Sequence, residues 1–234
     1  LIIFYKIDII KPIINFKNQI IISIISFIIS CAIVYRVIEH LPIIDFRPYN
    51  IQANIIDNMT VPEDAPKDIW KYDWKFTVDG SEKIISTSGE YPSVNGDFIS
   101  VETKLIKKGY EAPIHDFSIE LNDEDFSNEL LSEEKLLMFV LYNLSKSNFE
   151  LSSEIIKKSN QAVKKGYKVI GITASGIDKQ LEVKEQYGFE FDFYTCDETA
   201  LKTIIRSNPG ALEIQSGTIV NKWHYNDFNK IKFD

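Results

Sequence analysis

The chain has 234 residues and a net charge of −8, which is unevenly divided along its length. Residues 1–47 hold five lysines or arginines and three acidic residues, so the remainder holds 21 and 31, a net charge of −10. A domain this acidic argues against nucleic acid as a partner, because phosphate backbones bind basic surfaces. Only Cys31 and Cys196 are present, which excludes a disulfide framework.

An uncharged apolar run, NQIIISIISFIISCAIVY at 18–35, lies between Lys17 and Arg36. About 18 residues at roughly 1.5 Å per residue cover on the order of 27 Å, close to a hydrocarbon core of about 30 Å. The alternatives are a buried core helix and a signal peptide, but the run is long for a signal peptide and no small-residue cleavage site follows it. We therefore predict a transmembrane helix over 18–38.

The short flanks of this helix predict its orientation. Lys6, Lys11 and Lys17 stand against Asp8 in the flank at 1–17, so the basic excess lies before the helix. The positive-inside rule then places the N-terminus in the cytoplasm and the C-terminal domain outside. The chain begins with Leu1 in an apolar stretch, from which we expect it to start inside a longer protein with earlier membrane helices.

The segment after the helix, HLPIIDFRPYNIQANI at 40–55, combines a charge pair with apolar side chains. Asp45 and Arg47 are expected to pair at the membrane surface as scaffolding. Three apolar residues beside them are expected to anchor in the interface: Ile43, Ile44 and Phe46.

A membrane helix followed by LPIIDFRPY resembles the bacterial DoxX-like proteins, in particular the MauE/DoxX redox-associated membrane proteins with an extracytoplasmic thioredoxin-like tail. One of the several membrane helices of that family is present here. The resemblance implies a location in the inner membrane with a periplasmic domain. It also implies a membrane or periplasmic redox protein as partner.

A juxtamembrane segment and linker, 39–68, leads to a predicted β-rich insertion at 69–108. Apolar and polar residues alternate over 70–78, the period of a half-buried strand, and Asp79-Gly80 then offers a tight turn into a second strand at 83–87. The aromatic face of the first strand is suited to covering a sheet or docking on a neighbouring domain. Stacking of a ligand such as a sugar or quinone ring is the alternative.

A further domain, 109–234, begins with GYEAPIHDFSI, which resembles the opening of thioredoxin-like domains of the peroxiredoxin and TlpA kind. Hydrophobic periodicity predicts alternating strands and helices that end in a hairpin. The predicted strands are 135–144, 167–173, 189–195, 211–214 and 218–224, and the predicted helices are 149–165, 177–187 and a third from about 197 to 207. The closing stretch, from SNPG onward, resembles the thioredoxin element that carries a cis-proline, and Pro209 takes that position.

Thioredoxin chemistry needs two thiols two residues apart at a helix start, where the helix dipole lowers the first thiol's pKa. The resemblance aligns Ser145 and Asn148 with these two positions, within a residue or two, so both thiols are absent. Dithiol exchange and peroxide reduction are therefore not expected. Ser145 and Lys146 are expected to cap the following helix, with anion binding as the alternative.

Cys196 is the remaining candidate thiol. It stands where the third helix is predicted to start, so amide groups there would stabilise a thiolate; the alternative is a small buried side chain. His40, His115 and His224 show no ligand spacing, and we predict neither a metal site nor a cofactor.

Together these features predict an α/β protein: an N-terminal transmembrane helix followed by a thioredoxin-like fold with a small β-rich insertion. The first functional hypothesis is a redox-associated membrane component whose exposed domain is a docking module and not a catalyst. The second is a single-cysteine thiol oxidoreductase that uses Cys196. The third is a ligand-binding or structural protein of the cell envelope that uses the aromatic insertion.

Overall fold

The computed structural model describes residues 15–233, which divide into two compact units. The larger unit combines residues up to Asn54 with Asp116 onward, and the smaller unit is Ile55–His115. The smaller unit thus includes the linker and the opening segment of the predicted domain at 109–234, in addition to the predicted insertion at 69–108. The reason is that its two ends bond to each other, for example through Ile114 N and Asn58 O at 3.1 Å.

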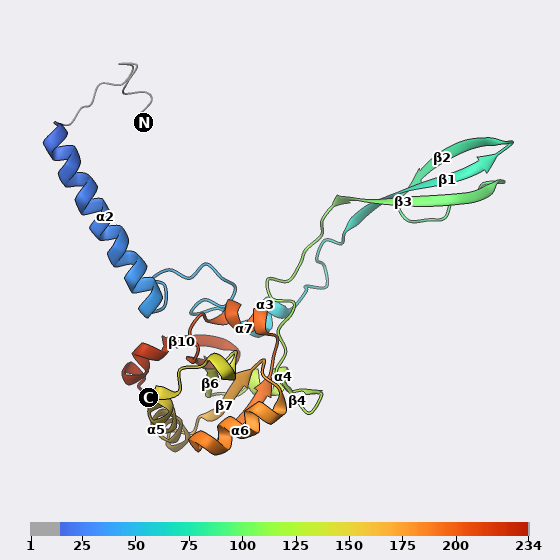
Figure 1. The fold of residues 1–234 in the computed structure, drawn as a ribbon. Helices are drawn as coiled ribbons and strands as arrows, with labels where there is room; N and C mark the ends of the chain where they lie inside the picture. The colour runs from blue at the N-terminus through green and yellow to red at the C-terminus, as the bar shows by residue number, and fades with distance from the viewer. Residues whose placement is uncertain (1–14, 234) are drawn as a thin grey trace. The chain divides into compact units, whose positions relative to one another are not determined.

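The N-terminal helix α2 spans Phe16–Glu39, close to the range predicted from the sequence (Figure 1). The side chain of Asn15 caps it by accepting a hydrogen bond from Lys17 N, and the helix ends at His40, whose backbone is extended. No side chain of the helix is buried. By length and composition α2 is able to cross a membrane, and the part of it between Lys17 and Arg36 carries no charged side chain.

The larger unit is built on a seven-stranded sheet in the order β10-β9-β6-β7-β8-β4-β5. Strands β6, β7 and β8 are parallel, whereas β9 runs antiparallel to β6 and forms a hairpin with β10. The strands are β4 Glu120–Leu121, β5 Glu124–Asp125, β6 Leu136–Val140, β7 Lys168–Thr173, β8 Asp192–Thr195, β9 Gly210–Gln215 and β10 Thr218–His224. The peptide bond between Asn208 and Pro209, just before β9, is cis. This order of strands and the cis-proline define a thioredoxin-like fold.

The helices connect the strands in the predicted order. They are α4 Ser127–Leu131, α5 Ser152–Lys164, α6 Ile177–Tyr187 and α7 Glu198–Ile204, with short 3-10 turns η1 Leu144–Lys146, η2 Phe149–Leu151 and η3 Tyr225–Lys230. Gly188 closes α6 in the left-handed conformation, which a glycine adopts without a steric penalty. The predicted third helix is too long by three residues, because Ile205 is already extended.

The core of this unit lies against the central strand β6, all of whose residues are buried. Leu137 and Phe139 belong to one buried hydrophobic cluster. The same cluster includes Ile155 of α5, Val183 of α6 and Phe228 of η3. The strand is shorter than the predicted 135–144, since the chain after Tyr142 leaves the sheet and enters the turn η1. That turn is the point at which thioredoxin-type chemistry is expected.

The smaller unit contains helix α3 Ile55–Met59 and a three-stranded antiparallel sheet in the order β2-β1-β3. Its strands are β1 Ile69–Val78, β2 Ser81–Thr87 and β3 Asp97–Lys107. Asp79 and Gly80 both have positive φ, which confirms the predicted tight turn. The stretch at 88–95, predicted as part of the β-rich insertion, is not a strand, but its Tyr91 covers the sheet.

Candidate functional site

The loop between β6 and α5 occupies the position at which a thioredoxin carries its dithiol. Asn143 caps the turn η1 by accepting a hydrogen bond from Ser145 N at 3.1 Å, and Asn148 caps η2 by accepting one from Glu150 N at 3.1 Å. Both predicted positions, Ser145 and Asn148, therefore lie in this loop. The capping side chains are the two asparagines and not Ser145, which is exposed. The expectation that Ser145 and Lys146 cap the helix was wrong.

Asn208, the residue before the cis-proline, holds this loop in place. Its Nδ2 donates to Asn143 O at 2.9 Å, and its Oδ1 lies 3.0 Å from the hydroxyl of Ser147. Its carbonyl also accepts a hydrogen bond from Asn148 N at 3.1 Å. The loop that replaces the dithiol and the loop of Pro209 thus form one hydrogen-bonded element, built from amides and a hydroxyl.

This element carries no group that can exchange thiols. Disulfide exchange and peroxide reduction both begin with a thiolate, and neither a hydroxyl nor an amide replaces it at neutral pH. The chemistry left to the loop is hydrogen bonding, through the exposed Ser145 and Lys146 and the half-buried Asn143, Ser147 and Asn148. Such a loop is suited to binding.

Cys196 follows β8 and is buried, with 4% of its surface exposed. Burial raises the pKa of its thiol to about 12, well above its ordinary value. Backbone hydrogen bonds from Ser118 and Asp197 act in the opposite direction, but burial outweighs them. The next amides at the start of α7, those of Thr199 and Ala200, donate to the Asp197 carboxylate. Cys196 therefore occupies the position predicted from the sequence, but its surroundings are those of an inert structural cysteine.

The juxtamembrane segment packs along strand β10. Gln52 N donates to Ile219 O at 2.7 Å, and Ile219 N donates to Ala53 O at 2.9 Å, so the segment extends the sheet at its edge. The side chain of Asn54 adds a bond of 3.1 Å to the hydroxyl of Thr218. These bonds connect the chain that follows α2 directly to the thioredoxin-like sheet.

A charge cluster fixes the same segment. Asp45 and Arg47 pair as predicted, with both carboxylate oxygens accepting from Arg47 Nε at 2.7 Å and Nη2 at 2.8 Å. Lys222 also joins this cluster, which sequence reasoning missed; its side chain is 3% exposed, and its Nζ donates to Asp45, Tyr49 O and Ile204 O. Burial raises the pKa of Asp45, but the hydrogen bonds from Arg47 and Lys222 outweigh it and lower that pKa to about 2.

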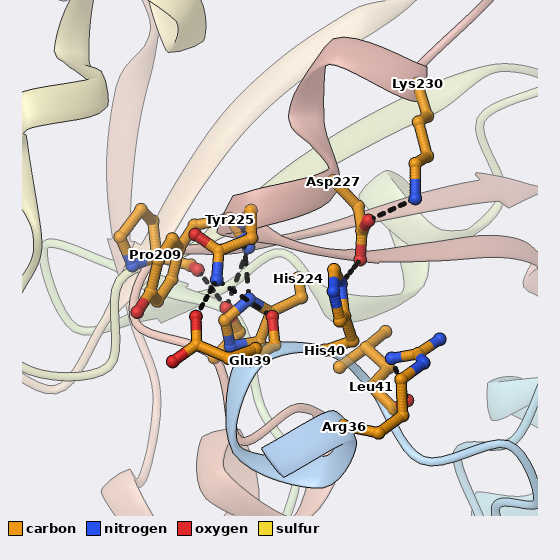
Figure 2. Close-up of polar contacts among 11 residues, drawn as sticks. Arg36, Glu39, His40, Leu41, Pro209, His224, Tyr225, Asp227 and Lys230 are labelled. Carbon is orange, nitrogen blue, oxygen red and sulfur yellow. Dashed lines mark hydrogen bonds and ion pairs between the residues drawn. The ribbon is translucent and has the colours of Figure 1, made fainter. Parts of the chain in front are cut away.

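The end of α2 meets the C-terminal segment in a second polar cluster (Figure 2). His40 Nδ1 lies 2.8 Å from Asp227 Oδ2, and Asp227 Oδ1 also binds Lys230 at 2.6 Å. Asn226 Nδ2 donates to the backbone and the carboxylate of Glu39 at 2.9 and 2.8 Å. The bonds of His40 and Glu39 link the end of α2 and the residue after it to η3, whereas the pair of Asp227 and Lys230 lies within η3.

Two of the three histidines come together in this cluster, which their separation in the sequence did not reveal. The rings of His40 and His224 lie 6.4 Å apart, and burial lowers the pKa of His224. His115 belongs to the smaller unit. Within residues 15–233, no group of three histidine, cysteine or acidic side chains is arranged to hold a metal ion.

The aromatic side chains of the smaller unit pack on one another. Trp74 meets Tyr91 edge to face with the ring centroids 5.0 Å apart, and Phe76 contacts both Tyr91 and Phe98. Phe76 is 1% exposed, and Trp74 Nε1 donates to the hydroxyl of Thr87 at 2.9 Å. These rings form the small core of the sheet, an arrangement that favours packing over ligand stacking.

Comparison with known proteins yields no match to a family model and no match to a curated protein. Among solved structures, a thiol:disulfide interchange protein from Bacteroides sp. is 13% identical, covering 49% of this chain and 82% of its own with a TM-score of 0.38. The thioredoxin domain of a thiol-disulfide oxidoreductase from Bacteroides vulgatus is 15% identical, covering 49% and 88% with a TM-score of 0.39. A thiol-disulfide oxidoreductase from Bacteroides fragilis is 18% identical, covering 45% and 86% with a TM-score of 0.37. The fold assignment rests on the strand order and cis-proline of this chain, and the DoxX/MauE resemblance stays a prediction.

Proposed function

We propose that this chain is a membrane-anchored, redox-associated protein of the DoxX/MauE kind, whose thioredoxin-like domain docks a partner protein and does not exchange thiols itself. Helix α2 is the anchor, and the domain lies on the extracytoplasmic side of the inner membrane. The observation that carries the proposal is the loop at 143–148, where amides and hydroxyls bonded to Asn208 stand in place of a dithiol.

Hydrogen bonds hold this loop in one conformation, which favours a loop that binds a partner over a loop that has lost its function. A loop held by several hydrogen bonds loses little conformational entropy when a partner binds it, so its exposed groups are available at low cost. Ser145 and Lys146 are exposed on this ordered loop. A thioredoxin-like domain that keeps its loop and lacks its thiols is suited to binding redox proteins without reacting with them; this step from fold to function is an analogy.

The two alternative functions have less support. A single-cysteine oxidoreductase requires a reachable thiolate, whereas the Cys196 thiol is buried with its pKa raised to about 12. A ligand-stacking role for the insertion requires free aromatic faces, whereas Trp74, Tyr91 and Phe76 contact one another.

Covalent trapping tests the docking role. In a full chain carrying Cys31→Ser, the change Ser145→Cys places a thiol on the exposed part of the loop. If a thiol redox protein docks there, the thiolate of Cys at this position attacks the partner's disulfide, forming a mixed disulfide and releasing one partner thiol. The expected result is a discrete, reductant-sensitive adduct with a membrane or periplasmic redox protein, identified by mass spectrometry.

The matched control is Lys164→Cys in the same background, since Lys164 is exposed at the end of α5. Adducts of equal yield at both positions, or none at position 145, contradict the docking proposal. Membrane anchoring is tested separately by carbonate extraction of the full chain. Retention in the membrane pellet is expected, and release into the supernatant contradicts the anchor.

A further inference from the structure

A pocket of about 280 Å³ lies where the end of α2, the following loop and the thioredoxin-like domain meet. Its lining combines two arginines, Arg47 and Arg206, with apolar side chains from α2 and the loop. The apolar lining residues are Val37, Ile38, Leu41, Pro42, Ile44 and Phe46. His40, His224 and Asp45 complete the lining. The site is thus mainly apolar with two arginines, and it lies next to the predicted membrane helix.

The arginines have unused hydrogen-bonding capacity. Arg47 binds Asp45 through Nε and Nη2, while its buried Nη1 has no hydrogen-bond partner among residues 15–233. A buried donor without a partner costs about 1–3 kcal/mol, so an acceptor is expected at this position. Arg206, which is exposed after α7, likewise makes no ion pair or side-chain hydrogen bond within the described chain.

The charge balance of the pocket is positive within a chain whose net charge is −8. Among the described residues that line it, Asp45 is the one carboxylate, and this carboxylate is shared between Arg47 and Lys222. Arg47 and Arg206 also line an adjoining hollow of about 490 Å³, together with Lys202 and Tyr142. An anionic group is therefore the ligand that this region attracts.

The apolar part indicates where that anion comes from. Ile43 and Phe46 are 87% and 90% exposed, and they continue the apolar surface of α2, where Ile38 is 65% exposed. Side chains of this kind are stable at the boundary between hydrocarbon and headgroups, and arginine binds phosphate oxygens through its planar fork of donors. A soluble inorganic anion would gain nothing from contact with the apolar residues of the lining, whereas a lipid would bury its acyl carbons against them.

We propose that this pocket binds the phosphate of an anionic phospholipid from the bilayer that α2 spans. Arg47 and Arg206 donate to the phosphate oxygens, and the glycerol end and first acyl carbons lie against Ile38 and Phe46. The inference rests on the membrane anchor in the proposed function. It adds that the domain is held against the membrane surface by lipid as well as by its covalent link to α2.

The test uses the full chain in neutral detergent micelles and native mass spectrometry, which counts bound lipids. Phosphatidylglycerol is compared with phosphatidylcholine of the same acyl chains. We expect phosphatidylglycerol to bind about tenfold more tightly, the size of effect that charge-assisted hydrogen bonds give. Arg206→Ala is expected to remove most of this preference. Lys164→Ala, the matched loss of an exposed cation at the far end of α5, is expected to preserve it.

Two further arms identify the source of the phosphate. In the first, inorganic phosphate is added at the same concentration as the phosphatidylglycerol that saturates the protein, and the lipid is expected to stay bound. In the second, Phe46→Ser is expected to weaken lipid binding severalfold. Equal binding of the two lipids, an unchanged preference in Arg206→Ala, or displacement by inorganic phosphate at equal concentration overturns the inference. A chain that resists carbonate extraction but shows no lipid preference contradicts this inference alone. A chain that carbonate releases contradicts the anchor itself.

Discussion

The ammonium group of Lys222 on β10 lies 2.9 Å from Oδ2 of Asp45, across a separation of 177 residues in the chain. The same ammonium binds the carbonyl oxygens of Tyr49 and Ile204, so one buried cation joins the juxtamembrane segment, β10 and the end of α7. This bond places the predicted membrane anchor and the thioredoxin-like sheet in one structural unit. It acts together with the backbone bonds of Gln52 and Ala53 to Ile219, which hold the segment at 40–54 on the domain.

Lys222→Met is expected to loosen this segment. The change leaves Asp45 paired with Arg47 alone and removes the donor from Tyr49 O and Ile204 O, which should cost about 1–3 kcal/mol. Hydrogen exchange at the amides of Gln52 and Ile219, which bond across this contact, should accelerate by at least tenfold. The control is Lys184→Met, whose partner Asp192 is 67% exposed and whose loss should cost less than about 1 kcal/mol. Equal effects of the two changes contradict the role of Lys222.

Acid should weaken the same contact in a defined range. The pKa of Asp45 is about 2 in the folded chain against an ordinary value of 3.8, so its stabilising contribution is complete above about pH 4 and is lost as the pH falls toward 2. The difference corresponds to about 2 kcal/mol. The free energy of unfolding is measured at about four pH values between pH 5 and pH 2. It should fall less with decreasing pH for Asp45→Asn than for the natural chain. Asp192→Asn controls for the loss of a negative charge, and identical pH profiles contradict this prediction.

The thioredoxin-like strands and helices could be predicted from the sequence because each has its own local signal. The buried run around β6, the helical spacing of α5 and α6, and Gly188 as a cap are all visible in short windows. The boundaries were less accurate where polar capping residues end an apolar run, as Asn143 does after β6. Local periodicity determines the existence of an element better than its ends.

The contacts within the candidate sites could not be predicted from the sequence, because they join residues that are far apart along the chain. Lys222 looks like an ordinary exposed lysine on a strand, and only the packing of 40–54 on β10 buries it. His40 and His224 meet for the same reason. Asn208 could have been noticed because it precedes the proline at the cis position. Its bonds to Asn143 and Ser147, however, depend on the three-dimensional return of β9 beside β6.

Cys196 should be slow to react in the folded chain. Because burial raises the pKa of its thiol to about 12, the thiolate fraction near neutral pH is very small, and the side chain is 4% exposed. In a Cys31→Ser chain, alkylation at about pH 8 should be far slower in buffer than in concentrated urea at the same pH. An apparent pKa below about 8.5, the reference for a free thiol, contradicts this prediction and revives the oxidoreductase hypothesis.

Asn208→Ala tests whether the loop at 143–148 depends on its neighbour for order and for docking. The change removes the bond from Nδ2 to Asn143 O and the contact of Oδ1 with the Ser147 hydroxyl, which should cost about 1–3 kcal/mol and speed hydrogen exchange in the loop. In a Ser145→Cys chain the yield of the trapped adduct should fall, because a disordered loop must be ordered again on binding. Asn160→Ala, at an exposed position on α5, should change neither quantity. A looser loop with an undiminished adduct yield shows that docking does not need the order that Asn208 provides, and the partner then contacts another part of the domain.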